Sequence, residues 1–294
     1  MANTLTTETT LDNLIPEVWS TILNSVRDKN LVFNPLFDHR FEAEFSGSPT
    51  DKIHVNGIDN FAAISGTTIA EAYSTGLDPL LFRAGALTTQ VDIAVTRHYY
   101  KAFALTHDAD LLSNVSTMTE FADRAGYAIA LEHDSYLAGF VDDWAQTVGT
   151  LNDDLDEDDV IRAVQYLNDA NVPYEDRFAV ISNAEDSNVK KWERFVNADY
   201  ARTVGSFPVD RGRGFIGSAH GLDWFVSNNV EGSNSAGHDN AIFGRQVVAV
   251  VVKEKMRVEG PTKDLESDST EYAVHSYYGA KEMRDTDGVW VKGR

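Results

Sequence analysis

Three glycines within residues 212–217 have the spacing of a phosphate-binding motif. The segment Gly-Arg-Gly-Phe-Ile-Gly matches G-x-G-x-x-G, in which backbone N–H groups approach a dinucleotide pyrophosphate. That chemistry requires a strand directly before the motif and a helix directly after it. Here Pro208 and Asp210 precede the glycines, and residues 222–226 predict a strand after them. We therefore expect a loop that leads into a hairpin, and no cofactor-binding residues.

An acidic run at residues 152–159 could supply oxygen ligands to a cation such as calcium. The run lacks the central glycine and the distal glutamate of an EF-hand loop. Carboxylates are also favoured in the first turn of a helix, because they interact with the helix dipole. Val160, Val164 and Leu167 follow at helical spacing. The run therefore predicts a helix start, with a cation site as the alternative.

The remaining side chains form no pattern typical of catalysis or metal binding. Eight histidines are scattered and none forms H-E-x-x-H; His133 lies between acidic residues, where a solvated or interfacial role is favoured. No G-x-S-x-G motif occurs, and residues 232–238 lack the lysine of a P-loop. With no cysteines, disulfides and thiol chemistry are excluded. We expect no catalytic residues, cofactor or metal, although a Ser–His–Asp triad leaves no local pattern and stays open.

The charge and hydropathy of the chain limit its partners. Asp and Glu number 46 against 25 Lys and Arg, a net charge of -21 that repels phosphate and argues against tight nucleic-acid binding. Such charge fits a soluble protein, a cation-rich environment or the inner wall of a container. The longest aliphatic run, residues 247–252, is too short to span a membrane. The start of the sequence has no signal-peptide pattern, so synthesis in the cytoplasm is expected.

Residues 1–37 are predicted to form an arm. Leu14, Val18, Ile22 and Val26 recur every four residues, as in a short amphipathic helix. The segment from Leu31 to Phe37 is strongly apolar but too short to build a core of its own. We expect it to dock elsewhere, on another subunit. The candidate interface residues in this arm are Trp19, Leu31, Phe33 and Phe37.

Residues 38–106 are predicted to form an extended β loop. Alternating residues at 52–55 and 91–96 indicate two strands, joined by a long connection rich in Gly, Ser and Thr. A two-stranded ribbon is marginal in water unless something covers it. The candidate interface residues here are Ile53, Val55, Val91 and Ile93.

The rest of the sequence predicts a long helix and a mixed domain. Residues 107–150 contain a helix over 117–148, opened by a Thr117-to-Glu120 capping box and ended by Gly149. Residues 151–260 alternate, with helices near 157–170 and 184–196, strands at 178–181 and 245–258, and two short strands over 214–230. Residues 261–294 are expected to return as strands to the domain of the long helix.

Several short segments of the sequence, in their order along the chain, resemble segments of the major capsid proteins of tailed bacteriophages, which have the Hong Kong 97-like fold. Residues 15–20 followed by 31–33 are similar to the arm, and residues 51–55 to the start of the extended loop. Residues 171–181 resemble a helix-to-strand passage of the axial domain, and residues 278–281 the closing segment. The likeness spans essentially the whole chain. It implies an α+β fold with an N-terminal arm, an extended β loop, a long spine helix in a peripheral domain and an α/β axial domain.

The resemblance also implies a function and partners. It predicts a non-enzymatic shell subunit that self-assembles into pentamers and hexamers of an icosahedral phage head, is assembled in the host cytoplasm and encloses double-stranded DNA. The partners would be other copies of the chain, a separate scaffolding protein, a portal, possible decoration proteins and non-specifically contacted DNA, with no membrane. A cellular nanocompartment shell, an acidic cation-dependent hydrolase and a salt-adapted binding protein are the alternatives.

Overall fold

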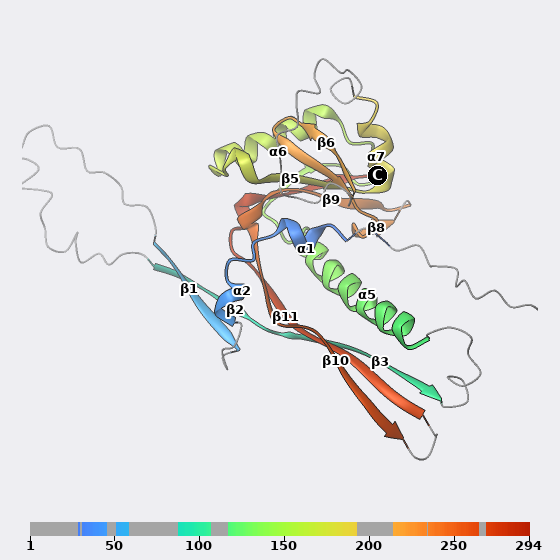
Figure 1. Ribbon diagram of the computed structural model, residues 1–294. Coiled ribbons are helices and arrows are strands. Elements are labelled where there is room, and N and C mark those ends of the chain that lie inside the picture. Colours follow the sequence, from blue (N-terminus) through green and yellow to red (C-terminus); the bar gives the residue numbers. More distant parts are fainter. Residues whose placement is uncertain are drawn as a thin grey trace, which may run out of the picture.

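The computed structural model describes residues 29, 31–45, 51–58, 88–106, 117–192, 214–233, 235–264 and 269–294. Within these ranges the chain builds a seven-stranded sheet, a three-stranded sheet of long strands and a two-stranded ribbon. In Figure 1 the long strands extend from one side of the seven-stranded sheet, and the ribbon projects on another side. The mixture of helices and sheets is the α+β class expected from the sequence.

The seven-stranded sheet has the order β4-β12-β9-β5-β7-β6, with β8 paired to β9. At its centre, β5 (Arg177–Ile181) is buried at all five positions and pairs parallel to β7 and antiparallel to β9. Its continuous apolar sequence suits a strand covered on both faces. The other strands are β4 (Gln146–Gly149), β6 (Phe215–Ala219), β7 (Leu222–Val226), β8 (Gly232–Ser233), β9 (Gly237–Gly244) and β12 (Gly288–Gly293).

One face of this sheet is covered by α6 (Glu157–Asp169), whose apolar side packs on β4, β12 and β9. The helix begins as the acidic run predicts, because the Asp156 carboxylate accepts the backbone N–H of Glu157 at 2.8 Å. The short helix α7 (Asn183–Val189) begins at Ser182, whose side chain accepts the N–H of Glu185. The predicted helix over 184–196 is therefore shorter where described, and residues 193–196 lie outside the described part.

The opposite face of the sheet packs against the N-terminal region and the end of α5. Here α1 (Phe33–Leu36) and residues near Leu137 and Trp144 meet β5 and β9 in one apolar core. Trp144 lies against Phe243, with ring centroids 5.6 Å apart. The core of the seven-stranded domain is thus completed by the end of α5 and by α1, which precedes the first strand of the sheet by more than a hundred positions.

The three-stranded sheet has the order β10-β11-β3, formed by Val248–Asp264, Ser269–Glu282 and Arg97–Thr106. The helix α5 (Thr117–Ala138) packs on β3 and β11, where Ala125 and Ile129 bury Val274. Helix α5 ends ten residues earlier than the predicted helix over 117–148. Residues from Gly139 onward turn toward the large sheet, and Val148 becomes part of β4, which pairs with β12. The side chains of the predicted capping box lie outside the described part.

The two-stranded ribbon joins β1 (Lys52–Ile58) to β2 (Thr88–Ala94) in antiparallel register. Its base contacts α2 (Glu42–Phe45) and the first residues of β10, where Phe45, Ile93, Ala249 and Val251 form a small core. Strands β1 and β2 correspond to the two strands predicted at 52–55 and 91–96.

The structure corrects three predicted segment boundaries. Residues 97–106 form β3 of the long sheet, so the extended loop does not continue to residue 106. Strand β10 also belongs to the long sheet, although residues 151–260 were expected to form the axial domain. Conversely, β12 lies inside the seven-stranded sheet, and residues 261–294 therefore serve both sheets. Pairing between strands distant in sequence decides these memberships, and local patterns do not record it.

Candidate assembly surfaces

The arm residues Phe33 and Phe37 are buried within the subunit. Both side chains are 0% exposed, and Phe37 lies 4.9 Å from Phe243 between ring centroids. The expectation that they need another subunit for burial is wrong, because β5, β9 and α5 of the same chain supply the apolar contacts. Leu31 is half-buried. Trp19 lies outside the described residues.

A buried carboxylate fixes this part of the arm on the spine helix α5. Asp134 is 0% exposed, and its Oδ1 accepts the backbone N–H groups of Phe33 at 2.9 Å and Asn34 at 3.2 Å. Its Oδ2 accepts the side-chain amide of Asn229 at 3.1 Å. Burial raises the pKa of Asp134, while these hydrogen bonds lower it in part. One carboxylate thus connects the arm, the spine helix and the seven-stranded domain.

Of the candidate residues on the ribbon, three are half-buried and one is buried. Ile53 lies opposite Ile93, and Val55 opposite Val91, so all four side chains share one face. Ile93 is 0% exposed because it packs on Phe45, Ala249 and Val251, and it is therefore a core residue of the subunit. Ile53, Val55 and Val91 keep part of their apolar surface accessible and remain candidates for contact with another molecule.

Histidines lie on both faces of the long sheet, one face being covered by α5 and the other being open, and their environments differ. His133 faces Tyr278, with ring centroids 3.9 Å apart, and burial lowers its pKa to about 4. Of the solvated and interfacial roles expected for His133, its burial against Tyr278 argues against full solvation. On the open face, His98 and His275 approach within 3.2 Å between ring nitrogens, and His275 also lies 3.4 Å from Glu259. These side chains connect β3, β11 and β10.

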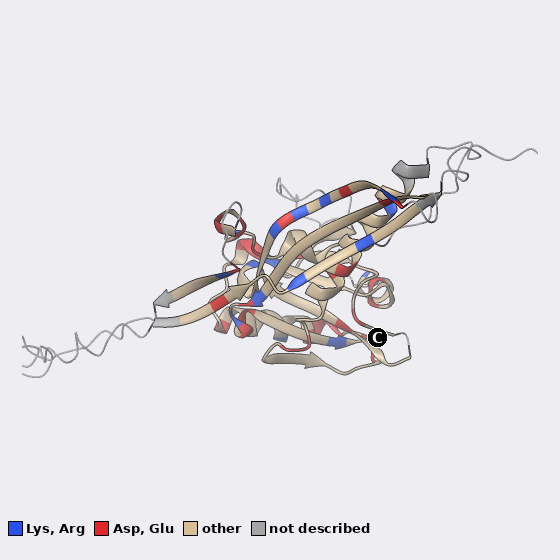
Figure 2. Cartoon of the chain, turned by 90° about the horizontal axis from the view of Figure 1, so that it is seen from below, with Lys and Arg blue, Asp and Glu red and all other residues tan. Residues whose placement is uncertain are grey.

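Basic side chains are spread along the long strands of this otherwise acidic chain. Figure 2 shows Lys and Arg along the long strands, and these residues lie mainly on β10 and β3. On β3, Arg97 and Lys101 have no acidic neighbour within the strand, whereas β10 alternates basic residues with Glu254 and Glu259. The three long strands together carry seven Lys or Arg and five Asp or Glu, in contrast to the acidic excess of the whole chain, and they can contact acidic surfaces.

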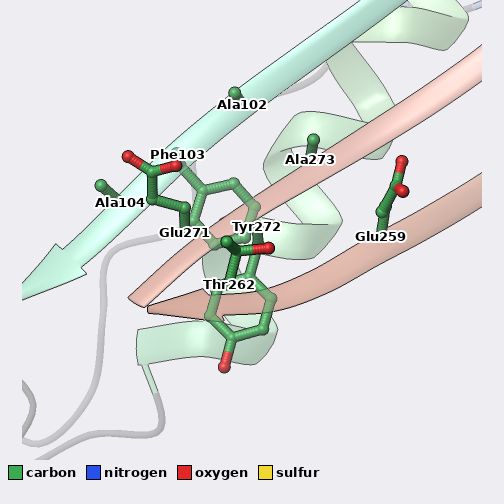
Figure 3. A pocket seen from close by; sticks show the side chains of 8 residues that line it. All are labelled: Ala102, Phe103, Ala104, Glu259, Thr262, Glu271, Tyr272 and Ala273. Carbon is green, nitrogen blue, oxygen red and sulfur yellow. The ribbon is translucent and has the colours of Figure 1, made fainter. Parts of the chain in front are cut away.

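A shallow hollow of about 400 Å³ lies on the outer part of the long sheet. Figure 3 shows three alanines, two aromatic rings, one threonine and two carboxylates around it. The lining residues are Ala102, Phe103, Ala104, Glu259, Thr262, Glu271, Tyr272 and Ala273. The hollow contains no nucleophile activated by a base, and no group of three or more potential metal ligands occurs among the described residues.

The glycine segment follows the hairpin interpretation where it is described. Gly214 has a φ of +77°, and a side chain there would meet the carbonyl of Val226. Strand β6 begins directly afterwards and pairs antiparallel with β7. A strand therefore lies where the dinucleotide motif needs a helix.

The comparison with models of known protein families shows the family of this chain. Residues 88–291 match the model described as phage capsid protein. The chain belongs to the phage capsid protein family. The matched region of this capsid protein contains β2, β3, α5, the seven-stranded sheet and the long strands, which includes most of the described structure. No match occurs among the curated proteins.

Solved structures share the fold of this capsid protein over nearly its whole length. A chain of Mycobacterium phage Che8 has a TM-score of 0.75 and 23% identity, covering 95% of this chain and 97% of that one. The capsid of cyanophage P-SCSP1u has a TM-score of 0.71 and 14% identity, covering 99% and 96%. The capsid of Ralstonia phage GP4 has a TM-score of 0.65 and 14% identity, covering 95% and 94%. The capsid fold predicted from the sequence, of the Hong Kong 97-like type, is confirmed.

Among the described helices, none is long and apolar enough to cross a membrane.

Proposed function

We propose that this chain is the major shell subunit of a tailed-phage head and acts by self-assembly into pentamers and hexamers. The membership of residues 88–291 in the phage capsid protein family carries the proposal. The ribbon supports it, because a two-stranded ribbon with half-buried Ile53, Val55 and Val91 gains stability when another molecule covers it. Contacts of moderate size, repeated around closed rings, would then add up to a stable shell.

The charge suggests how the shell and its contents coexist. A net charge of -21 keeps free subunits soluble and repels packaged double-stranded DNA from the inner wall. Basic residues along β3 and β10 would contact DNA or acidic protein surfaces without sequence preference. We further propose assembly in the host cytoplasm with a separate scaffolding protein and a portal, and decoration proteins are possible additional partners.

The assembly test uses the full-length chain expressed with its genomic neighbours. Wild-type protein is expected to form closed shells in negative-stain electron microscopy. Val55→Asp places a charge on the half-buried ribbon face and should abolish shells. The thermal unfolding midpoint should fall only partly, because Val55 also packs on the small core around Phe45 and Ile93, and circular dichroism should show that the subunit stays folded. The matched control His54→Asn changes the adjacent residue, which points to the opposite face of the ribbon. Monomers in every preparation, or shells formed equally well by Val55→Asp, would contradict the proposal.

A truncation tests the role of the arm separately. Removal of residues 1–28 deletes Trp19 but retains Phe33 and Phe37, which the subunit core needs. We expect a folded subunit that fails to form closed shells. Removal of residues 1–37 would instead destabilise the subunit itself, so only the shorter truncation measures assembly.

A further inference from the structure

Strand β10 exposes apolar side chains on the same side of the long sheet as α5. The helix packs on β3 and β11 and leaves the outer half of β10 uncovered. Met256 is 48% exposed and Val258 is 54% exposed. Val258 pairs with Val274, which α5 buries, and the Met256 sulfur lies 3.5 Å from the position of a Cβ added to Gly126. Both side chains therefore lie beside the helix and are accessible to solvent.

The adjoining side of α5 is formed by small residues. Ala122, Gly126 and Ala130 recur every four positions and so lie above one another along the helix. All three are half-buried, and outside the backbone of α5 itself a Cβ on Gly126 would meet only the Met256 sulfur within 4 Å. We call the surface formed by Ala122, Gly126, Ala130, Met256 and Val258 the α5–β10 flank. It is apolar and partly open to solvent.

The chain upstream of α1 reaches α5 next to this flank. The Lys29 backbone N–H donates to the Tyr127 hydroxyl at 2.7 Å, and Tyr127 directly follows Gly126. Phe33 is bound at Asp134 and Lys29 at Tyr127. These two positions on α5 are seven residues, or about 10 Å, apart, so the chain from Phe33 back to Lys29 runs toward the start of the helix. Three further residues can extend by about 10 Å, which brings Val26 within reach of the flank.

We propose that residues 14–28 of the same chain dock on the α5–β10 flank. Leu14, Val18, Ile22 and Val26 form one apolar stripe at helical spacing, and this stripe would cover Met256 and Val258. The position of Lys29 supports docking in the same subunit, because the adjacent segment needs no large detour to reach the flank. The arm would thereby complete the long sheet of its own subunit before any contact with neighbours.

Cysteine pairs test this contact cleanly, because the full chain contains no cysteine. The double variant Val26→Cys/Met256→Cys, oxidised in the unassembled full-length protein, should form a disulfide within one chain. Monomer-sized protein on non-reducing electrophoresis, with the linked peptide identified by mass spectrometry, would support the proposal. A bond between chains would assign the flank to the arm of a second copy and overturn it, as would no bond. The control is Val26→Cys/Phe121→Cys, which should form no disulfide. Phe121 is also exposed, but it stacks on Phe103 and lies outside the flank.

A second variant tests the same contact without new bonds. Gly126→Leu places a large side chain on the flank, whereas Gly126→Ala makes only ordinary contact with Met256. Trypsin cleavage after Arg27 should become about tenfold faster in Gly126→Leu and stay unchanged in Gly126→Ala, as expected for loss of a weak docking equilibrium. Equal cleavage rates in all three proteins would overturn the proposal. These readouts use unassembled subunits, so they are independent of whether the chain forms shells.

Discussion

The Oδ1 atom of Asp134 lies 2.9 Å from the backbone nitrogen of Phe33, a residue 101 positions earlier in the chain. This hydrogen bond holds the start of α1 against the spine helix, and the Phe33 side chain then enters the core beside β9. The same carboxylate accepts the amide of Asn229 from the seven-stranded domain. The relative placement of three segments therefore depends on one buried side chain.

Replacement of Asp134 should separate its hydrogen bonds from its charge. Asp134→Ala leaves the N–H groups of Phe33 and Asn34 without their acceptor and should cost about 2–4 kcal/mol of unfolding free energy. Asp134→Asn retains an oxygen for these groups and removes a buried charge, so it should cost at least about 1 kcal/mol less than alanine. Urea denaturation of the unassembled subunit measures both. Equal losses of unfolding free energy in the two variants would show that the charge of Asp134 itself is required.

The buried guanidinium of Arg177 predicts a second large effect. It donates to the Asn168 side chain at 2.7 Å and to the carbonyls of Val172 and Pro173, after the end of α6. Arg177→Met leaves these acceptors unsatisfied and should cost about 2–4 kcal/mol. Arg245→Met is the control, because its partly exposed ion pair with Asp176 should contribute less than about 1 kcal/mol. Similar midpoints in urea for the two variants would contradict this interpretation.

Close contact at Gly288 predicts a steric effect that a sequence cannot show. A Cβ at this position would lie 2.4 Å from Cδ2 of the Trp144 ring, which is buried. Gly288→Ala should therefore destabilise the subunit by about 1–3 kcal/mol through overpacking. Gly126→Ala, which meets only the Met256 sulfur at 3.5 Å, should instead stabilise α5 by up to about 1 kcal/mol. Opposite shifts of the thermal midpoint are expected.

His133 predicts a specific dependence of stability on pH. Burial lowers its pKa to about 4 from the usual 6.5, so the unfolded chain binds a proton in this interval that the folded subunit does not. The contribution of His133 to stability is therefore complete above about pH 6.5 and falls as the pH decreases toward 4, by at most about 3 kcal/mol. Unfolding free energies at pH 7.5, 5.5 and 4.5 should fall less steeply in His133→Gln. If the unfolding free energies of the wild type and His133→Gln fell in parallel with pH, this would contradict the lowered pKa of His133.

Local patterns predicted the elements whose residues carry their own signal. The acidic run before Val160 predicted the start of α6, and the apolar residues 178–181 predicted β5, because caps and short apolar runs act over a few residues. The hairpin after the glycine segment was recognised from the same kind of information. These features needed no knowledge of distant partners.

The rest depends on partners far away in the sequence. Val148 continues the helical spacing of α5, but it belongs to a strand because β12 pairs with it. The apolar character of Phe33 and Phe37 was evident, whereas the sheet that buries them was not. Asp134 lies among the charged residues of a helix, and only the approach of Phe33 and Asn229 distinguishes it. Of the candidate interface residues, the half-buried ribbon positions Ile53, Val55 and Val91 still await the assembly test.

The placement of β12 between β4 and β9 has a consequence for biosynthesis. Strand β4 can find its neighbour only after residues 288–293 have left the ribosome, and β3 likewise waits for β11, which begins at residue 269. Contacts between such distant segments slow folding. Nascent chains therefore carry an unpaired β3 until β11 has been synthesised and an unpaired β4 until β12 has been synthesised, and unpaired strand edges of this kind are prone to aggregation.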